Sequence, residues 1–273
     1  MKNNFVHRIL ARLGIIQRLG RSSRIKAGTG ACPEGLAGFA FENSLKDPTG
    51  FYHSCVAYFD QHLPTHLKEH RRYFSQNQRG FGEDAFHVMW SLLVDRFKPV
   101  NFLEIGVYRG QVLSLVGLLQ HDHGIQGRNT GIGPFERIGD AASVTAYGYC
   151  PDWLEDIKTN IARFDLPQPQ LVKALSTEPA AIKAIRSTPW DMIYIDGNHD
   201  YEVVIEDWKN CAANIRPGGV IVLDDSGLGS GFRPPLFASA GFPGPSEIAN
   251  SVGTGVFREI LQVGHNRAFQ KAW

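Results

Sequence analysis

Clustered aspartates follow two short apolar runs in the second half of the chain. One run ends at Asp196, and the next ends at Asp224 and Asp225. If the two runs are neighbouring parallel strands, their carboxyl ends meet at one edge of a sheet, where the carboxylates converge. Converging carboxylates repel one another unless a cation lies among them, and oxygen ligands suit Mg²⁺ or Mn²⁺. The alternative interpretation is helix capping, which we expect of Asp200.

An earlier apolar run leads into a turn that carries an acid and glycines. Glu104 lies near the end of this run, and Gly106 and Gly110 follow it. Glycines allow a tight turn and a close approach of the backbone to a ligand, and the helix that follows offers unpaired N–H groups. A dinucleotide-binding turn has a glycine where Glu104 stands, and a carboxylate there disfavours a diphosphate and favours a ligand with an ammonium group. An ordinary strand-to-helix turn is the alternative.

The elements that must position these residues alternate regularly from residue 99 onward. Apolar runs typical of strands alternate with helical stripes of apolar residues. Strands are expected at 100–105, 130–135, 170–175, 191–195, 218–223 and 266–271, and helices at 111–119, 154–164, 179–185, 201–215 and 256–261. Continuously apolar strands between helices indicate an α/β fold of the Rossmann-like, doubly wound type, with a mainly parallel sheet covered by helices on both faces.

The chain divides into three segments. Residues 1–50 are expected to form a basic amphipathic arm with a Gly- and Pro-rich linker, and residues 51–98 a helical lead-in. Residues 99–273 are expected to form the main domain. Within that domain, residues 226–255 are rich in Gly, Pro, Ser and Phe. Loops of this length in a compact domain are usually functional, so we predict a lid over the site.

The N-terminal arm concentrates the basic charge of a chain whose formal net charge is +1. Residues 1–26 hold seven Lys and Arg and no acid, which leaves 21 cations against 27 acids in the rest of the chain. A mildly acidic body disfavours a nucleic-acid groove. The arm fits attachment to an anionic membrane surface or to a partner, and a transit peptide is a further interpretation. The alternative is a terminal helix packed on its own domain or on a sister subunit of a homo-oligomer.

Composition excludes several classes of protein. Hydrophobic residues make up 43% and charged residues 20% of the chain, which is typical of a globular protein. No apolar run approaches the roughly 20 residues that cross a bilayer. The four cysteines form no CxxC pair, which argues against a disulfide scaffold and a cysteine zinc site and favours a reducing compartment. We therefore expect a cytoplasmic protein, with membrane association only through the arm.

Residues 99–225 resemble a known family. The stretch from Glu104 to Gly110 resembles motif I of class I S-adenosylmethionine-dependent methyltransferases. The stretch from residue 191 to Asp225 is similar to the metal-dependent macrocin O-methyltransferase-like group, whose members methylate sugar hydroxyls. The resemblance implies S-adenosylmethionine as cofactor, with Glu104, Gly106 and Gly110 on its methionine side. It also implies Mg²⁺ or Mn²⁺ bound by Asp196, Asp224 and Asp225.

The same resemblance suggests roles for further residues. An acid after the second strand is expected to hold the cofactor ribose, and Glu136 and Asp140 are the nearest acids. Ser176, after the third strand, is expected to contact the adenine side. His199 stands three residues after Asp196, the offset at which the similar catechol-type metal-dependent methyltransferases carry a lysine base. We therefore predict His199 as the catalytic base, with a role in orienting its loop as the alternative.

The function implied is methyl transfer to a hydroxyl oxygen of a sugar or another small natural-product or glycan acceptor. One alternative is an NAD(P)-dependent oxidoreductase on the same fold, which Glu104 disfavours. The other is a catalytically silent binding or assembly subunit. Replacement of Gly106 by Val is expected to abolish cofactor binding and to leave the fold intact.

Overall fold

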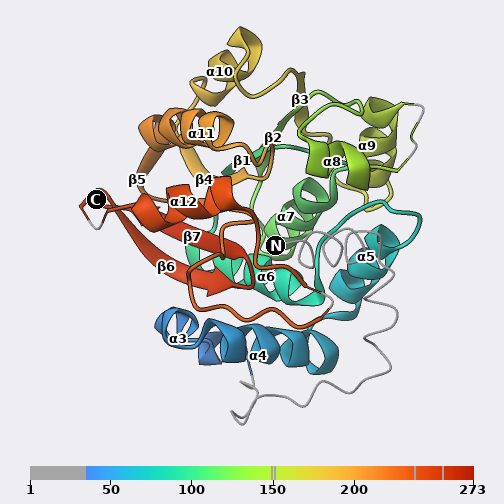
Figure 1. Ribbon diagram of the computed structural model, residues 1–273. Coiled ribbons are helices and arrows are strands. Elements are labelled where there is room, and N and C mark those ends of the chain that lie inside the picture. The colour runs from blue at the N-terminus through green and yellow to red at the C-terminus, as the bar shows by residue number, and fades with distance from the viewer. Residues whose placement is uncertain (1–34, 149, 151, 237, 254) are drawn as a thin grey trace.

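A seven-stranded sheet forms the centre of the computed structural model, which describes residues 35–273 except residues 149, 151, 237 and 254. The strand order is β3-β2-β1-β4-β5-β7-β6 (Figure 1). Their bounds are β1 (Asn101–Ile105), β2 (Arg128–Gly133), β3 (Gln170–Lys173), β4 (Trp190–Ile195), β5 (Ile215–Leu223), β6 (Phe257–Val263) and β7 (Asn266–Lys271). β1 to β5 pair in parallel, and β7 pairs antiparallel with β5 and β6. The predicted doubly wound, mainly parallel fold is confirmed.

Alternating side chains of the central strands feed two separate hydrophobic cores. In β4, Met192 and Tyr194 belong to one cluster of buried residues, and Ile193 and Ile195 belong to the other. Successive side chains of a strand point to opposite faces of the sheet. An unbroken apolar strand is therefore stable only where helices cover both faces, which is why the sequence pattern indicated this architecture.

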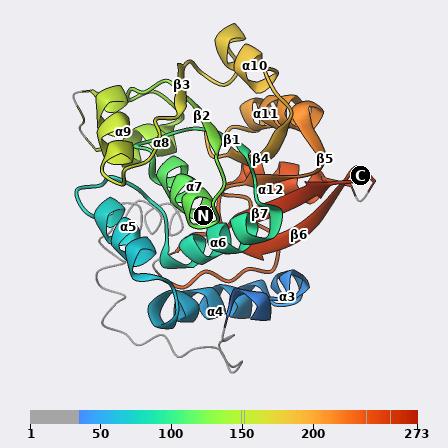
Figure 2. The same ribbon diagram turned by 180° about the vertical axis from the view of Figure 1, so that it is seen from behind.

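Two groups of helices cover the two faces of the sheet, as both views show (Figures 1 and 2). Helices on one face contribute to the same buried cluster as Ile193, and helices on the other face to the cluster of Met192. The first group is α10 (Pro179–Ile185), α11 (Tyr201–Asn214) and α12 (Pro243–Ser251). The second includes α4 (Pro48–Gln61), α6 (Asp84–Phe97), α7 (Gln111–Asp122) and α9 (Trp153–Ala162). The remaining helices are η1 (Leu36–Gly38), α3 (Phe41–Lys46), α5 (Thr65–Ser75) and α8 (Ala141–Ala146).

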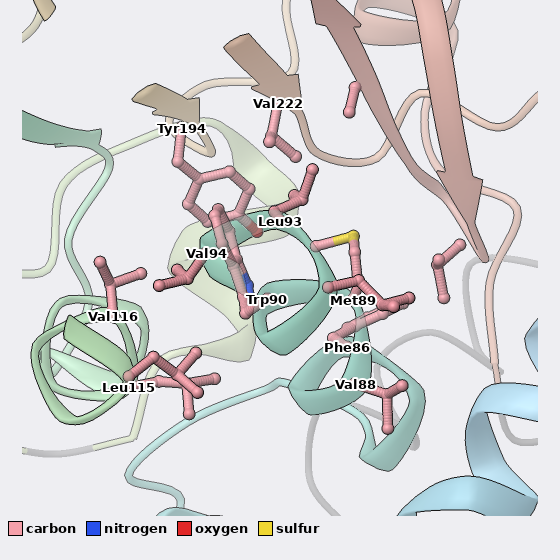
Figure 3. Close-up of a cluster of buried hydrophobic side chains, with 14 of the residues drawn as sticks. Phe86, Val88, Met89, Trp90, Leu93, Val94, Leu115, Val116, Tyr194 and Val222 are labelled. Carbon is pink, nitrogen blue, oxygen red and sulfur yellow. The ribbon is translucent and has the colours of Figure 1, made fainter. Parts of the chain in front are cut away.

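Helix α6 joins the helical lead-in to the sheet. Its Trp90 packs edge-on against Tyr194 of β4, with ring centroids 5.0 Å apart, and against Phe102 of β1 at 5.8 Å. Figure 3 shows Trp90, Leu93 and Tyr194 within one continuous apolar cluster. Because Tyr194 lies two residues before Asp196, the lead-in helps to fix the strand end that carries this acid.

The basic arm, residues 1–26, lies outside the described residues, so the interpretations of it stay predictions. Among the helices of the described part, none is both long and apolar enough to cross a membrane.

Two local expectations are wrong. Residues 41–46 of the expected linker are helix α3, because Phe41 and Ser44 are buried and α3 packs on β6. The expected helix 256–261 is strand β6, since pairing with β7 outweighs apolar spacing that fits either structure. The expected lid segment contains helix α12, whose Ile248 and Ala249 are buried, and its role as a lid stays a prediction.

Replacement of Trp90 by Ala tests the role of this packing. Trp90 is 1% exposed, and large-to-small changes of buried aromatic residues typically cost about 3–5 kcal/mol. We expect the free energy of unfolding, measured by urea denaturation, to fall by roughly this amount. Trp273 is 90% exposed, so Trp273→Ala is the matched control and should change stability by about 0.5 kcal/mol or less. An equal fall in the free energy of unfolding of both variants would contradict the role of Trp90 in joining α6 to the sheet.

Candidate active site

A cleft opens at the carboxyl ends of the central strands. Its empty space, including the open mouth, measures about 1020 Å³. The turns after β1 and β4, the end of β5, part of the lead-in and the turn between β6 and β7 line this cleft. The lining residues include, in chain order, Phe86, Glu104, Gly106, Gln111, Asp196, His199, Asp224 and His265. The structure thus brings together residues that the sequence places in three separate stretches. Gly110, Glu136, Asp140, Ser176 and Asp225 are not among the lining residues of this cleft.

Glu104 presents a buried carboxyl group to the cleft. It is 4% exposed, and burial raises its pKa to about 8, while the backbone N–H of Leu113 opposes this shift. Its Oε2 has no hydrogen-bond partner among the described residues. A buried acceptor without a partner is costly and marks a place where a donor is expected to bind.

Gln111 is the first residue of α7 and also lines the cleft. Its Oε1 accepts a hydrogen bond of 3.1 Å from the backbone N–H of Gly82, which fixes the side chain. Its Nε2 is buried and has no acceptor within the described part of the chain. Glu104 and Gln111 together therefore offer one acceptor and one donor to a ligand that carries groups of both kinds. Sequence reasoning missed Gln111, because a glutamine at a helix start has no distinctive signal.

Only a glycine fits at position 106, because the turn after β1 contacts the turn after β4 there. Its φ is +96°, and a Cβ there would lie 2.0 Å from the carbonyl oxygen of Asp196. The backbone of the turn after β4 therefore occupies the space that a side chain would need. The expectation that Gly106→Val leaves the fold intact is wrong. Gly110, with φ of +79°, is the N-cap of α7, and a Cβ there would lie 3.2 Å from Ile157.

The imidazole of His199 lies between two carboxylates. Its Nδ1 is 2.7 Å from Oδ2 of Asp140, and its Nε2 is 2.8 Å from Oδ2 of Asp225. Carboxylates accept hydrogen bonds, so this arrangement suits an imidazolium that donates from both nitrogens. In this state neither nitrogen has a lone pair with which to take a proton from a substrate. The geometry therefore favours the alternative interpretation, in which His199 orients its loop.

Asp140 is the N-cap of α8. It accepts hydrogen bonds from the backbone N–H groups of Ala142 and Ser143, and from the backbone and ring of His199. Burial alone would raise the pKa of Asp140, but the hydrogen bond and charge of His199 and the backbone donors hold it well below its usual range. Its oxygens are therefore engaged by the protein.

The other two residues predicted to contact the cofactor lie apart from the cleft. Glu136 is half exposed, and its Oε1 is 3.8 Å from Nζ of Lys173. Ser176 lies beside Asp207 of α11, where its hydroxyl partly offsets the burial that raises the pKa of Asp207 to about 7. Contacts of Glu136, Asp140 and Ser176 with a cofactor stay predictions.

A cluster of possible metal ligands lies at the end of β5. One ligand atom each from Asp224, Asp225 and His265 can be chosen so that all lie within 4.8 Å of one another. Asp196 lines the same cleft as Asp224 but is not part of this cluster. Its neighbour Tyr194 has a raised pKa because of burial, the charge of Asp196 and a hydrogen bond to it. Sequence reasoning missed His265, because the strand that precedes it was taken as a helix.

Comparisons with known proteins agree with this fold. Residues 103–226 match the family described as "Methyltransferase domain". The matched stretch is 124 of the 273 residues, a little under half of the chain. An uncharacterized protein of Acanthamoeba polyphaga mimivirus is 28% identical over 145 residues, which are 51% of this chain and 58% of that protein. The matched region thus spans little more than half of that relative.

Two solved structures share the fold at low sequence identity. An SAH-bound methyltransferase of Podospora anserina, PaMTH1, is 14% identical, with a TM-score of 0.53 over 80% of this chain and 92% of that chain. An O-methyltransferase of Bacillus cereus in complex with SAH is 16% identical, with a TM-score of 0.51 over 83% of this chain and 100% of that chain. Both likenesses support the Rossmann-like methyltransferase fold.

Replacement of Glu104 by Gln tests the buried carboxyl group. A folded-state pKa of about 8, above the ordinary value of 4.5, means that the folded protein binds the extra proton at intermediate pH. The wild type should therefore lose stability as pH rises from about 5 through 8, by about 1.4 kcal/mol per unit at most. Glu104→Gln should lack this loss and be the more stable protein at pH 8.5.

The measurement is urea unfolding of both proteins at pH 5 and pH 8.5. Glu136→Gln, at a half-exposed position, is the control and should follow the wild type at both values. If the stability of Glu104→Gln depended on pH in the same way as that of the wild type, ionisation of Glu104 would not lower the stability of the folded protein.

Proposed function

We propose that the protein is an S-adenosylmethionine-dependent O-methyltransferase that acts on a hydroxyl group of a small molecule. The observation that carries this proposal is the pair of buried groups on Glu104 and Gln111 that have no hydrogen-bond partner among the described residues, in the cleft of a chain that matches a methyltransferase family over residues 103–226. The methionine end of the cofactor carries an ammonium and a carboxylate. Oε2 of Glu104 suits the ammonium, and Nε2 of Gln111 suits the carboxylate.

Aromatic residues next to these groups suit the less polar part of the cofactor. The ring of Tyr108 stacks on Phe81 at 4.8 Å and on Tyr147 at 4.9 Å, and all three side chains line the cleft. Tyr108 lies in the turn after β1, four residues after Glu104, and both residues line the cleft. When bound, S-adenosylmethionine supplies an electrophilic methyl group. The residues of the cleft bind it, orient it and exclude water.

The acceptor is expected on the side of the cleft that carries Asp196 and Asp224. An oxygen acceptor is supported by the likeness to the Bacillus cereus O-methyltransferase, and a sugar hydroxyl by the resemblance of residues 191–225 to the macrocin O-methyltransferase-like group. Carboxylates at this edge suit a divalent cation. Such an ion lowers the pKa of a hydroxyl that it binds, which would activate the acceptor oxygen.

In this proposal, His199 is a positioning residue. Its ring fixes Asp225 behind the cleft and ties it to Asp140, because both carboxylates accept from the same imidazole. Loss of the ring would leave two buried carboxylates without their common donor. His199 thereby stabilises the acidic edge on which a cation would bind.

Calorimetric titration of the full chain with S-adenosylmethionine tests the cofactor assignment. Binding of the ammonium is expected to favour the ionised form of Glu104, which glutamine cannot adopt, and a hydrogen bond to a charged group contributes about 1.5–3 kcal/mol. We expect the Kd to rise by at least about tenfold. Glu206→Gln, at an exposed position on α11 that does not line the cleft, is the matched control and should leave the Kd unchanged.

A parallel titration with NADH and NADPH distinguishes the rival functions. Tight binding of a nicotinamide cofactor without S-adenosylmethionine binding would replace this proposal with an oxidoreductase. Binding of neither cofactor would favour a silent subunit.

Replacement of Asp224 by Asn tests the acceptor side. Asp224 follows β5, whereas Glu104 and Gln111 belong to β1 and α7, so we expect cofactor affinity to change by less than about threefold. Methyl transfer to a sugar hydroxyl, followed with radiolabelled cofactor, should fall by at least about 100-fold. A chelator should abolish transfer by the wild type, and Mg²⁺ or Mn²⁺ should restore it. The control is Asp165→Asn, at an exposed position. Full transfer in chelator would remove the metal from the proposal.

A further inference from the structure

The turn between β6 and β7 brings a histidine to the acidic end of β5. β7 runs antiparallel to β5, with Leu223 paired to Arg267. Continuing this register by two residues along each strand places His265 opposite Asp225. Accordingly, Nε2 of His265 lies 3.3 Å from Oδ1 of Asp224 and 3.5 Å from Oδ1 of Asp225.

The hydrogen bond on the other side of the ring fixes which nitrogen faces the carboxylates. Nδ1 of His265 lies 2.9 Å from the carbonyl oxygen of Ser239. A carbonyl oxygen only accepts, so Nδ1 carries a proton and donates it. Nε2 is therefore the nitrogen that meets Asp224 and Asp225. A histidine that donates one N–H to a backbone carbonyl and points its other nitrogen at acidic groups has the arrangement typical of metal-binding histidines.

Two of the spacings among the three ligand atoms fit a shared ion. Two atoms bound to one ion at about 2.1 Å lie roughly 3.0 Å apart at an octahedral angle and about 3.4 Å apart at a tetrahedral angle. The distances of 3.3 Å and 3.5 Å from Nε2 of His265 to Asp224 and Asp225 lie close to these values. These two distances therefore match those between ligands that share an ion, and one ligand atom from each of the three residues can be chosen within 4.8 Å of the others.

The backbone around His265 is held firmly. Its carbonyl oxygen accepts hydrogen bonds from the backbone N–H of Ser226 at 2.8 Å and from the Ser226 hydroxyl at 3.2 Å. Gly264, with φ of +62°, makes the turn, and Phe86 packs against the imidazole with ring centroids 4.8 Å apart. His265 itself is 8% exposed. These contacts orient the ring before any ion binds, which favours binding.

We propose that His265, Asp224 and Asp225 form a mixed nitrogen and oxygen metal site that prefers a transition-metal ion such as Mn²⁺ or Fe²⁺ to Mg²⁺. Imidazole nitrogen is a good ligand for these ions, whereas Mg²⁺ is held mainly by oxygen. The inference rests on the metal ion of the proposed function and deepens it by naming a ligand and a class of ion. The site itself is defined by contacts of the protein alone.

Mn²⁺ added to the full-length protein is the probe, without cofactor or acceptor. Pulsed electron paramagnetic resonance should detect coupling of bound Mn²⁺ to one imidazole ¹⁴N nucleus. Titration should show Mn²⁺ binding at least about tenfold tighter than Mg²⁺. His265→Ala should lose the nitrogen coupling and bind Mn²⁺ at least about tenfold more weakly, with a much smaller change for Mg²⁺.

Two controls separate ligation from general damage. His121 has a side chain that is 83% exposed, so His121→Ala should keep both the coupling and the affinity. His265→Gln preserves a polar side chain and should lose the coupling while keeping the melting temperature closer to that of the wild type. The wild-type spectrum decides the question even where a variant fails to fold.

Bound Mn²⁺ without nitrogen coupling in the wild type, or with coupling that persists in His265→Ala, would overturn the proposal. So would an absence of Mn²⁺ binding, which would leave His265 as a residue that only contacts the two aspartates. None of these outcomes affects the titration of S-adenosylmethionine, so failure of the metal site and failure of the proposed function are distinguishable.

Discussion

A line of polar contacts through His199 and Asp225 holds the loops at the carboxyl edge of the sheet together. Asp140, after β2, accepts from one nitrogen of His199, after β4, and Asp225, after β5, accepts from the other. Asp225 in turn lies 3.5 Å from His265, whose second nitrogen donates to Ser239. Five segments that are distant in the sequence are thereby fixed relative to one another. Because buried charges are stable only when they are paired, removal of one member is expected to disturb the others.

Two acids near this edge of the sheet have pKa values shifted in opposite directions. Burial acts on both. It raises the pKa of Glu104 to about 8, and one oxygen of Glu104 has no hydrogen-bond partner among the described residues. The donors around Asp140 outweigh burial and hold its pKa well below the usual range. Asp140 therefore receives its hydrogen bonds from the protein itself, whereas Glu104 can accept a further hydrogen bond from a ligand. Perturbed acids without internal partners cluster at functional sites, which is why Glu104 carries more of the functional argument than Asp140.

The sequence predicted those features that depend on neighbouring residues or on strand order. The apolar runs and helical stripes were sufficient to predict the parallel sheet. The expected order of its strands was sufficient to predict that Asp196 and Asp224 line one cleft. The partners of His199 were not predictable, because Asp140 lies 59 residues earlier and meets it only after the chain folds. Gly106 shows the same limit. A glycine in a cofactor turn suggests approach of a ligand, whereas the structure places the backbone of Asp196 there.

The position of His265 follows from topology. A strand that runs antiparallel beside β5 must begin where β5 ends, so the residues before β7 meet the residues after Leu223. Sequence analysis assigned residues 256–261 to a helix, and with that assignment no hairpin turn existed to deliver a side chain to Asp225. Once β6 and β7 are a hairpin, the turn between them becomes part of the carboxyl edge, alongside the turns of the parallel strands. Among the described residues, β7 is the strand that runs antiparallel beside β5, and the turn before it carries the imidazole of His265 to the acidic end of β5. In a wholly parallel sheet every connection returns through a crossover, so another loop would have to supply such a side chain.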